Sequence, residues 1–232
     1  MINKTAAIIA GAGSGHRLGA DLPKALVKLI DKTLVEHAVA ALAPVAELII
    51  VTAPAGFEDK FKELLGDQVT VITGGVLRSD SIRIALASIP NQYEYVLVHD
   101  AARSLAPTAL AKSVVDQLVN GEQAVVPVLD LVDTIKEVDA SGYVRNTPNR
   151  STLRAVQTPQ GFPAAEFRSA ISATLGNFTD DASVWRAHGG TVRTVAGDEK
   201  SLKITTEGDL KGFAGSNRVG IGTDTHAFSD LN

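Results

Sequence analysis

A glycine-rich loop followed by two cations is the part of the chain whose residue types and spacing best fit chemistry on a phosphate. The loop covers residues 11–19 and contains four glycines; Arg17 lies within it, and Lys24 follows after Pro23. Glycines let backbone N–H groups approach an anion without obstruction by side chains. Nearby cations can neutralise the charge that develops when a phosphoryl bond is made or broken. The sequence therefore predicts that this loop holds the phosphates of a nucleotide.

The loop differs from two better-known phosphate-binding patterns. A dinucleotide-binding fingerprint that begins at Gly11 needs a glycine at position 16, where the chain has His16. A P-loop needs Gly-Lys followed by Ser or Thr, whereas Lys24 stands between Pro23 and Ala25. The remaining alternative is a glycine-rich connection between a strand and a helix that binds no ligand. The two cations favour phosphate binding over that alternative.

A carboxylate and a guanidinium directly follow a second apolar run, residues 95–99. Asp100 suits Mg²⁺, which takes one or two carboxylates together with phosphate oxygens of a substrate. Arg103 can hold a phosphate through two parallel hydrogen bonds. The alternative is that Asp100 caps a turn and Arg103 is solvated. Their place at a strand end beside a separate phosphate loop favours a binding site.

Three further positions carry weaker signals. Gly75 follows another strand and leaves the backbone open to read the edge of a base, with the hydroxyl of Ser81 nearby, although a simple capped turn fits equally well. Thr158 belongs to a rigid polar turn with Pro159. Lys203 fits an exposed strand lysine, and nothing in the residues alone singles it out.

Apolar runs rich in Val and Ile alternate with helical patterns along the chain. Thr33 and Glu36 form a capping box that predicts a helix through Leu42, and two more helices are expected from Ser79 and after Pro107. Such alternation predicts an α/β fold with a mostly parallel sheet covered by helices on both faces. Ligands of such sheets bind beyond the carboxyl ends of the strands. The strands are expected at residues 6–10, 48–52, 69–73, 95–99 and 124–128.

The segment 133–150 has a different pattern. Polar and apolar residues alternate over 134–138 and 143–145, around a turn signal at 139–142. The pattern predicts a protruding two-stranded arm. An isolated hairpin is marginal in water, so this arm is expected to pack on another surface, such as a second subunit. A hairpin that lies on its own domain is the alternative, which the residues alone slightly favour.

Composition excludes several classes of protein. The 232 residues fit one large domain, or one domain and a fragment of another, and carry a formal charge of −4. That charge argues against a general nucleic-acid binder. The absence of cysteine excludes disulfides and thiol chemistry. No apolar run reaches the length of a membrane span, so a cytoplasmic protein without membrane partners is expected.

Six motifs in this order resemble the 2-C-methyl-D-erythritol 4-phosphate cytidylyltransferases over about residues 5–212. This resemblance implies a Rossmann-like nucleotidyltransferase fold and a place in the non-mevalonate isoprenoid pathway. It also implies that CTP and methylerythritol phosphate, with Mg²⁺, give 4-diphosphocytidyl-2-C-methyl-D-erythritol and pyrophosphate. The motifs are the loop with Arg17 and Pro23-Lys24, Gly74-Gly75 to Asp80-Ser81, Val98 to Arg103, Asp133-Thr134, Gln157 to Gln160, and Lys203 to Thr205.

The resemblance also implies a role for each matching residue. Arg17 and Lys24 are expected to be catalytic and to stabilise the α-phosphate. Asp100 is expected to organise Mg²⁺ and substrate, and Thr134 and Arg150 to come from the partner's arm in a homodimer. The expected CTP-binding residues are Gly11, Ala12, Gly13, Gly15, Gly75 and Ser81, and the expected acceptor-binding residues are Asp100, Ala101, Arg103, Thr134, Arg150, Thr158 and Lys203.

Four positions depart from the family pattern. Gly11 stands where alanine is usual, Ser14 where an aromatic residue is common, Ser104 where proline is customary, and Val76 where an acid is frequent. The family contacts at these positions run largely through backbone. Weakened positioning at most is therefore expected, with activity retained.

The C-terminal residues resemble a second family. Residues 218–228 are similar to the opening strand of 2-C-methyl-D-erythritol 2,4-cyclodiphosphate synthases, in which an Asp-x-His pair binds zinc. Asp224 and His226 would be those ligands, although zinc needs at least a third. The expected organisation is a cytidylyltransferase domain at 1–210, a linker at 211–217, and the truncated start of a fused synthase at 218–232.

Two other functions compete with this interpretation. A ribitol 5-phosphate cytidylyltransferase has nearly the same core motifs, and the synthase-like tail argues against it. A regulatory module that binds nucleotide without turnover is the rival from another class. Intact Arg17, Lys24 and Asp100 argue against that module.

Overall fold

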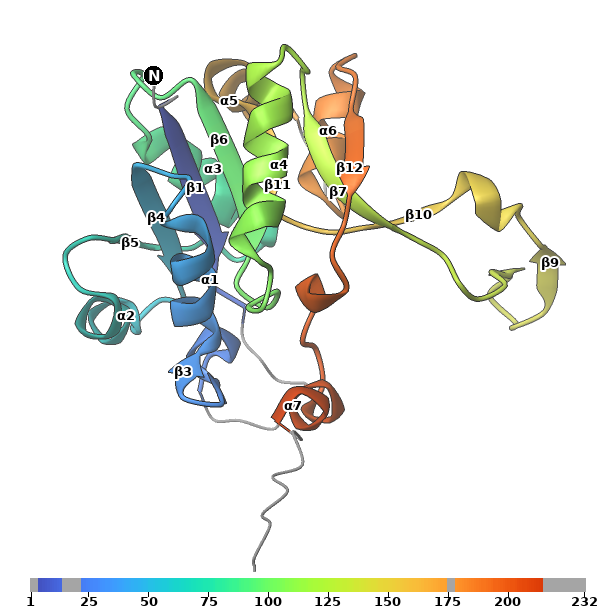
Figure 1. The fold of residues 1–232 in the computed structure, drawn as a ribbon, viewed down its shortest axis with the longest axis horizontal. Helices are drawn as coiled ribbons and strands as arrows, with labels where there is room; N and C mark the ends of the chain where they lie inside the picture. Colours follow the sequence, from blue (N-terminus) through green and yellow to red (C-terminus); the bar gives the residue numbers. More distant parts are fainter. Residues whose placement is uncertain (1–3, 14–21, 175–177, 215–232) are drawn as a thin grey trace, which may run out of the picture.

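The computed structural model describes residues 4–13, 22–174 and 178–214. They form a central sheet with helices on both faces, and a hairpin arm extends away from this body (Figure 1). The α/β class predicted from the sequence is confirmed. Within the described residues the sheet has eight strands, in the order β10-β7-β11-β6-β1-β4-β5, with β12 also paired to β7.

One half of the sheet is parallel and contains the first predicted strands. β6 and β4 flank β1 in register, and β5 pairs with the outer edge of β4. The predicted boundaries of these strands are confirmed to within one residue. The strands are β1 (Thr5–Ala10), β4 (Leu48–Ala53), β5 (Thr70–Thr73) and β6 (Tyr95–Asp100).

The other half of the sheet is mixed. β12 runs parallel to β7, whereas β10 and β11 are antiparallel to their neighbours. The sequence did not indicate β10 or β11, because each is only three or four residues long and β11 contains Gly161 and Pro163. The strands are β7 (Val125–Asp130), β10 (Arg154–Val156), β11 (Gln160–Pro163) and β12 (Arg193–Ala196).

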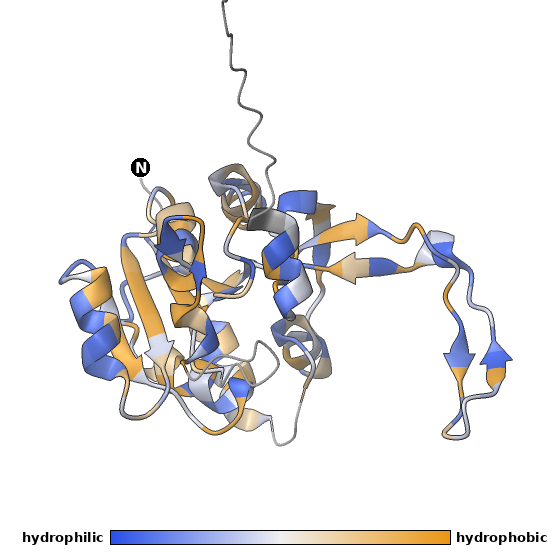
Figure 2. Cartoon of the chain, turned by 90° about the horizontal axis from the view of Figure 1, so that it is seen from below, coloured by the Kyte–Doolittle hydropathy of each residue, from blue (hydrophilic) through white to orange (hydrophobic). Residues whose placement is uncertain are grey.

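Two hydrophobic cores cover the two faces of this sheet. Ala7 and Ile9 of β1 point to one core, and Ala6 and Ile8 point to the other, because successive side chains of a strand alternate. This two-sided burial explains the nearly continuous apolar strands, which are orange in Figure 2. The first face carries α1 (Leu34–Leu42), α2 (Glu58–Leu65) and α4 (Thr108–Val119), and the second carries α3 (Arg78–Ser88), α5 (Ala164–Ala173) and α6 (Asp181–Ala187).

Local signals set the start of α1 as predicted. The Thr33 hydroxyl accepts from the Glu36 N–H at 3.3 Å, and the Glu36 carboxylate accepts from the Thr33 N–H at 2.7 Å. This capping box satisfies two helix-end donors. The hairpin of β2 (Lys28–Leu29) and β3 (Lys32–Thr33) precedes the helix, and Leu29 and Leu34 pack with Ile204 near α7 (Glu207–Ala214). That last helix includes the first four residues of the segment predicted as a linker.

The arm projects from the body rather than lying on it (Figures 1 and 2). The alternative of a hairpin on its own domain is therefore wrong. Only β8 (Glu137–Val138) and β9 (Val144–Asn146) pair, fewer residues than the alternation predicted. Asp139 closes the turn by accepting from two backbone N–H groups, and Gly142 has a positive φ of 86°. Short 3-10 helices are η2 (Lys24–Leu26), η3 (Arg150–Thr152) and η4 (Glu199–Ser201).

In the part of the chain that the structure describes, every helix is too short or too polar to cross a lipid bilayer.

Candidate active site

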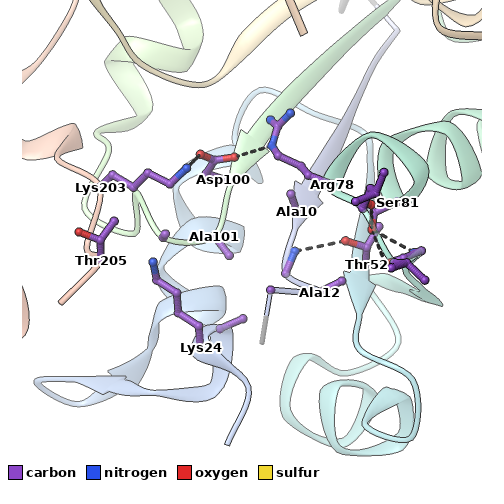
Figure 3. Close-up of a pocket in the computed structure, with 17 residues that line it drawn as sticks. Ala10, Ala12, Lys24, Thr52, Arg78, Ser81, Asp100, Ala101, Lys203 and Thr205 are labelled. Atoms are coloured by element: carbon purple, nitrogen blue, oxygen red, sulfur yellow. Dashed lines mark hydrogen bonds and ion pairs between the residues drawn. The ribbon is translucent and has the colours of Figure 1, made fainter. Parts of the chain in front are cut away.

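A cavity of about 480 Å³ opens at the carboxyl ends of β1, β4 and β6 (Figure 3). Ligands of open α/β sheets bind at this edge. The cavity brings together segments that are far apart in the sequence. They are residues 10–13, Lys24 and Ala25, Thr52, 75–78 with Ser81, 100–102, and Lys203 with Thr205.

The glycine loop forms one wall of the cavity, as predicted, as far as Gly13. The N–H of Gly11 donates to the Thr52 hydroxyl at 3.2 Å. A Cβ at Gly11 would lie 2.8 Å from the Thr52 carbonyl oxygen and 3.3 Å from the Phe61 ring. Gly11 is therefore packed too closely against β4 and α2 to carry a side chain. Gly15, Arg17 and Ser14, which the sequence places next in this loop, lie outside the described residues.

The turn after β5 packs against the glycine loop. A Cβ at Gly74 would lie 2.5 Å from that of Ala12, so only glycine lets the two loops approach this closely. The Gly75 N–H donates to the buried Ser81 hydroxyl at 3.0 Å, and that hydroxyl also donates within the turn. Ser81 thus shapes the turn on which Gly75 lines the cavity. Val76, where the family often has an acid, is 99% exposed at the rim.

Lys24 enters the cavity from η2. Pro23 has an extended backbone before this short helix, and Ala25 and Leu26 are buried beneath it. With these neighbours anchored in the core, the Lys24 side chain extends toward Ala101 and the Asp100–Lys203 pair (Figure 3). This placement agrees with a cation that acts on a bound phosphate.

Asp100 lies at the end of β6 and pairs with two cations. Its Oδ1 accepts from the Arg78 Nε at 3.1 Å, and its Oδ2 accepts from the Lys203 Nζ at 2.8 Å. Burial alone would raise the pKa of Asp100, but the charges of Arg78 and Lys203 outweigh it and hold that pKa well below its usual range. Asp100 is therefore ionised at neutral pH. The Lys203 segment is irregular chain between η4 and α7, so the suggestion of a strand lysine is wrong.

Arg78 and Asp181 are site residues that the motifs did not reveal. Arg78 begins α3, lines the cavity and forms a bidentate pair with Asp181 of α6, at 3.1 and 2.7 Å. Burial would lower the pKa of Arg78, but Asp181 and Asp100 raise it above its ordinary value. A cation in the first turn of a helix is disfavoured by the helix dipole, so the position of Arg78 at the start of a predicted helix is the one local signal that it has a special role. The partner at position 181 leaves no such signal in the sequence.

His99 and Thr158 support Asp100 from behind the cavity. The Thr158 hydroxyl accepts from the Asp100 N–H at 3.1 Å and lies 3.0 Å from His99 Nδ1. Complete burial lowers the pKa of His99 to about 4, so the ring is neutral at pH 7. Neither side chain lines the cavity. Thr158 orients the strand end in this structure, and its predicted contact with the acceptor stays a prediction.

Arg103 also faces away from the cavity. Its Nη1 donates to the Ser201 carbonyl at 2.7 Å and its Nη2 to the Val156 carbonyl at 3.0 Å. Burial lowers the pKa of this guanidinium. Arg103 thus ties β10 to η4, next to Lys203, and the predicted phosphate contact stays a prediction. Ser104, the next residue, is buried.

The two arm residues lie apart from the cavity of their own chain. Thr134 is exposed, and Arg150, the first residue of η3, donates to the Val132 carbonyl. Neither lines the cavity.

Among the described cavity residues, Gly11, Ala12, Gly13, Lys24, Gly75, Ser81, Asp100, Ala101 and Lys203 are those that the sequence predicted and the structure brings together.

The Rossmann-like sheet, the glycine loop and the cationic cavity at its carboxyl edge define an α/β nucleotidyltransferase. Residues 5–214 match the family of 2-C-methyl-D-erythritol 4-phosphate cytidylyltransferases. The chain belongs to this family, whose reaction is CTP-dependent cytidylyl transfer to methylerythritol phosphate in isoprenoid biosynthesis.

Individual relatives agree with this assignment. The enzyme of that name from Rhodococcus jostii is 45% identical over 206 residues, which cover 88% of this chain and 91% of the relative. The crystal structure of the Thermus thermophilus cytidylyltransferase superposes with a TM-score of 0.78 at 31% identity, covering 91% of this chain and 97% of that one. The bifunctional IspDF of Campylobacter jejuni gives a TM-score of 0.77 at 27% identity, covering 90% of this chain and 53% of that one.

Proposed function

We propose that the cavity binds CTP along its glycine side and methylerythritol phosphate along the side of Asp100 and Lys203. One observation carries this division. Gly11–Gly13 and Gly75 offer backbone on one wall, whereas the paired charges of Asp100 and Lys203 line the other. A wall without bulky side chains lets a triphosphate lie close to the backbone, and a lysine beside a carboxylate suits an acceptor that carries both a phosphate and hydroxyls.

The chemistry that fits this arrangement is in-line displacement. An oxygen of the acceptor phosphate attacks the α-phosphorus of CTP, a new P–O bond forms, and pyrophosphate leaves with the electrons of the broken bond. The attacking oxygen is already anionic, so the step requires no general base. Lys24 neutralises charge on the α-phosphate, and Arg17 is proposed to act with it.

Asp100 is the residue that we propose for Mg²⁺. Among residues 4–13, 22–174 and 178–214 no group of three or more His, Cys, Asp or Glu is placed to hold a metal. A single carboxylate fits this ion, because Mg²⁺ commonly takes one or two carboxylates and completes its shell with waters and phosphates. Each Asp100 oxygen accepts one hydrogen bond and keeps a second lone pair. The ion would neutralise phosphate charge during transfer.

The arm is proposed to pair two copies of the chain. It carries exposed apolar side chains, among them Val138 at 59% and Tyr143 at 73% exposure, and it projects from its own body (Figure 1). Thr134 and Arg150 would then reach the partner's acceptor side, where Arg103 and Thr158 lie behind the wall. Sedimentation of the purified chain tests this: a dimer that Tyr143→Ser weakens is expected, and a monomer at all concentrations would contradict it.

One assay tests acceptor choice. The chain is incubated with CTP, Mg²⁺ and either methylerythritol phosphate or ribitol 5-phosphate, and pyrophosphate release is measured. Release with methylerythritol phosphate is expected. Release with ribitol phosphate alone would overturn the proposed acceptor, and no release with either would favour a nucleotide-binding module without turnover.

The C-terminal residues are proposed to open a fused cyclodiphosphate synthase domain. Asp224 and His226, the expected zinc ligands, lie outside the described residues. The fused arrangement in the Campylobacter jejuni protein supports the proposal. It is tested by extending the chain with its natural coding sequence downstream of Asn232. The extended protein should bind zinc and form the cyclodiphosphate, and a chain that binds no zinc would contradict the fusion.

A further inference from the structure

Asp181 is linked to the cavity by its contact with Arg78. It is the first residue of α6, is 3% exposed and does not itself line the cavity. Its two carboxylate oxygens accept from the two terminal nitrogens of Arg78, at 3.1 and 2.7 Å. The remaining nitrogen of that guanidinium, Nε, donates to Asp100 Oδ1 at 3.1 Å (Figure 3).

This geometry fixes the plane of the Arg78 guanidinium. Two parallel hydrogen bonds to one carboxylate allow the guanidinium plane less rotation than a single hydrogen bond does. With the fork held by α6, only the Nε–H is directed at Asp100, while Lys203 takes the other carboxylate oxygen at 2.8 Å. The orientation of Asp100 is thus set by one contact from α3 and one from the segment before α7.

The four side chains also balance in charge. Arg78 and Lys203 supply two positive charges, and Asp100 and Asp181 supply two negative charges. Burial of a carboxylate costs free energy unless the group is paired. Arg78 is the partner that offsets this cost for the buried Asp181. Removal of the Asp181 charge would free two ends of a guanidinium beside a cavity that binds phosphates.

We propose that Asp181 is a positioning residue of the transfer reaction: it holds Arg78 so that Asp100 is fixed toward the acceptor, and it keeps the guanidinium from turning to substrate phosphate. This inference rests on the proposed placement of Asp100 on the acceptor side. Without Asp181, the Arg78 fork loses its bidentate partner and Asp100 loses its defined orientation. The nucleotide wall of Gly11–Gly13, Gly75 and Ser81 keeps its own hydrogen bonds.

Asp181→Asn tests the proposal, and Asp180→Asn is its matched control. Asp180 is the adjacent carboxylate and caps α6 by accepting from the Ser183 N–H at 3.1 Å, a role that asparagine also fills. Its other oxygen accepts from Gln160 Nε2 at 3.1 Å, a contact that asparagine does not keep. It does not contact Arg78 in the described structure. Asp181→Asn is expected to lower kcat about 10- to 100-fold and to raise KM for the acceptor, with KM for CTP changed less than about 3-fold. Asp180→Asn should stay within about 2-fold of the parent in each parameter.

A double-variant cycle separates positioning from a general loss of structure. If Asp181 acts through Arg78, then Arg78→Gln combined with Asp181→Asn is no slower than Arg78→Gln alone. Asp181→Glu retains the charge and should recover at least a third of the lost kcat, which also keeps the test open if Asp181→Asn fails to fold. Additive losses, an equal loss in Asp180→Asn, or loss of CTP binding instead of acceptor binding would overturn the proposal.

Asp100→Asn distinguishes failure of this inference from failure of the function beneath it. If Asp100→Asn leaves kcat and acceptor KM within about 2-fold of the parent, the proposed role of Asp100 is wrong and the positioning of Asp100 is irrelevant. If Asp100→Asn impairs turnover and a folded Asp181→Asn does not, the inference about Asp181 alone is overturned.

Discussion

The cavity wall and the arm are built by opposite kinds of contact. At the wall, Arg78 bonds a carboxylate 103 positions away and another 22 positions away, and these groups are largely buried. In the arm, Asp139 bonds its fourth neighbour and Lys136 bonds a hydroxyl 11 positions away, all in exposed surroundings. Long-range buried bonds fix a side chain within the monomer, whereas local exposed bonds keep a hairpin in shape without anchoring it.

This contrast assigns different roles to the two regions. Charges at the wall are held in place by contacts within the chain, which is the condition for electrostatic stabilisation of a transition state. The arm exposes polar and apolar groups away from its own body, where a second chain is proposed to pack. A change at the wall should therefore alter chemistry within one chain, and a change at the arm should act between chains.

The largest effect is expected at the wall, from Lys24→Ala. If Lys24 acts on the α-phosphate as proposed, its removal should lower kcat on the order of 1,000-fold, about 4 kcal/mol of transition-state stabilisation, with a smaller effect on KM for CTP. Lys28→Ala, an exposed lysine four residues further on, is the control. Pyrophosphate release under saturating substrates measures both, and an unchanged rate in Lys24→Ala would remove it from catalysis.

The next effect concerns the stability of the wall as the pH falls. The pKa of His99 is about 4 in the folded chain and ordinarily 6.5, so between these values the unfolded chain binds more protons. The contribution of His99 to the unfolding free energy is therefore complete above pH 6.5. It should fall by about 3 kcal/mol as the pH decreases to 4. Urea unfolding at several pH values measures this. In His99→Gln the same interval should be flatter, and an identical slope would contradict the assignment.

The sequence predicted these two regions unequally well, for physical reasons. The parallel strands, the capping box at Thr33 and the arm are encoded in local periodicity, and the structure confirms them. Gly11–Gly13, Lys24 and Asp100 follow strand ends or short motifs, so their meeting at one sheet edge could be inferred. The Arg78–Asp181 pair and the contacts of Thr158 with Asp100 and His99 depend on which distant elements pack together. No local sequence pattern indicates that packing.

A smaller effect is expected from the arm, in Arg150→Ala. If Arg150 reaches the partner's acceptor, KM for methylerythritol phosphate should rise about 10-fold, about 1.4 kcal/mol, with KM for CTP unchanged. Arg145→Ala is the control on the same arm, since that guanidinium pairs locally with Asp139 at 2.7 Å. Steady-state kinetics with each substrate varied in turn measures the difference. Equal KM changes in both variants would mean a general effect on the arm.

The smallest effect should come from Tyr143→Ser on the folded monomer. The side chain is 73% exposed at the tip of the arm, so its loss removes little buried area, and the unfolding free energy should change by less than about 0.5 kcal/mol. If the arm joins two chains, the same substitution should lower stability at high protein concentration, because association stabilises only the folded state. Chemical unfolding at two concentrations 100-fold apart separates these effects. A loss of stability that is the same at both concentrations would mean that the arm packs on its own chain, and the contrast with the wall would then fail.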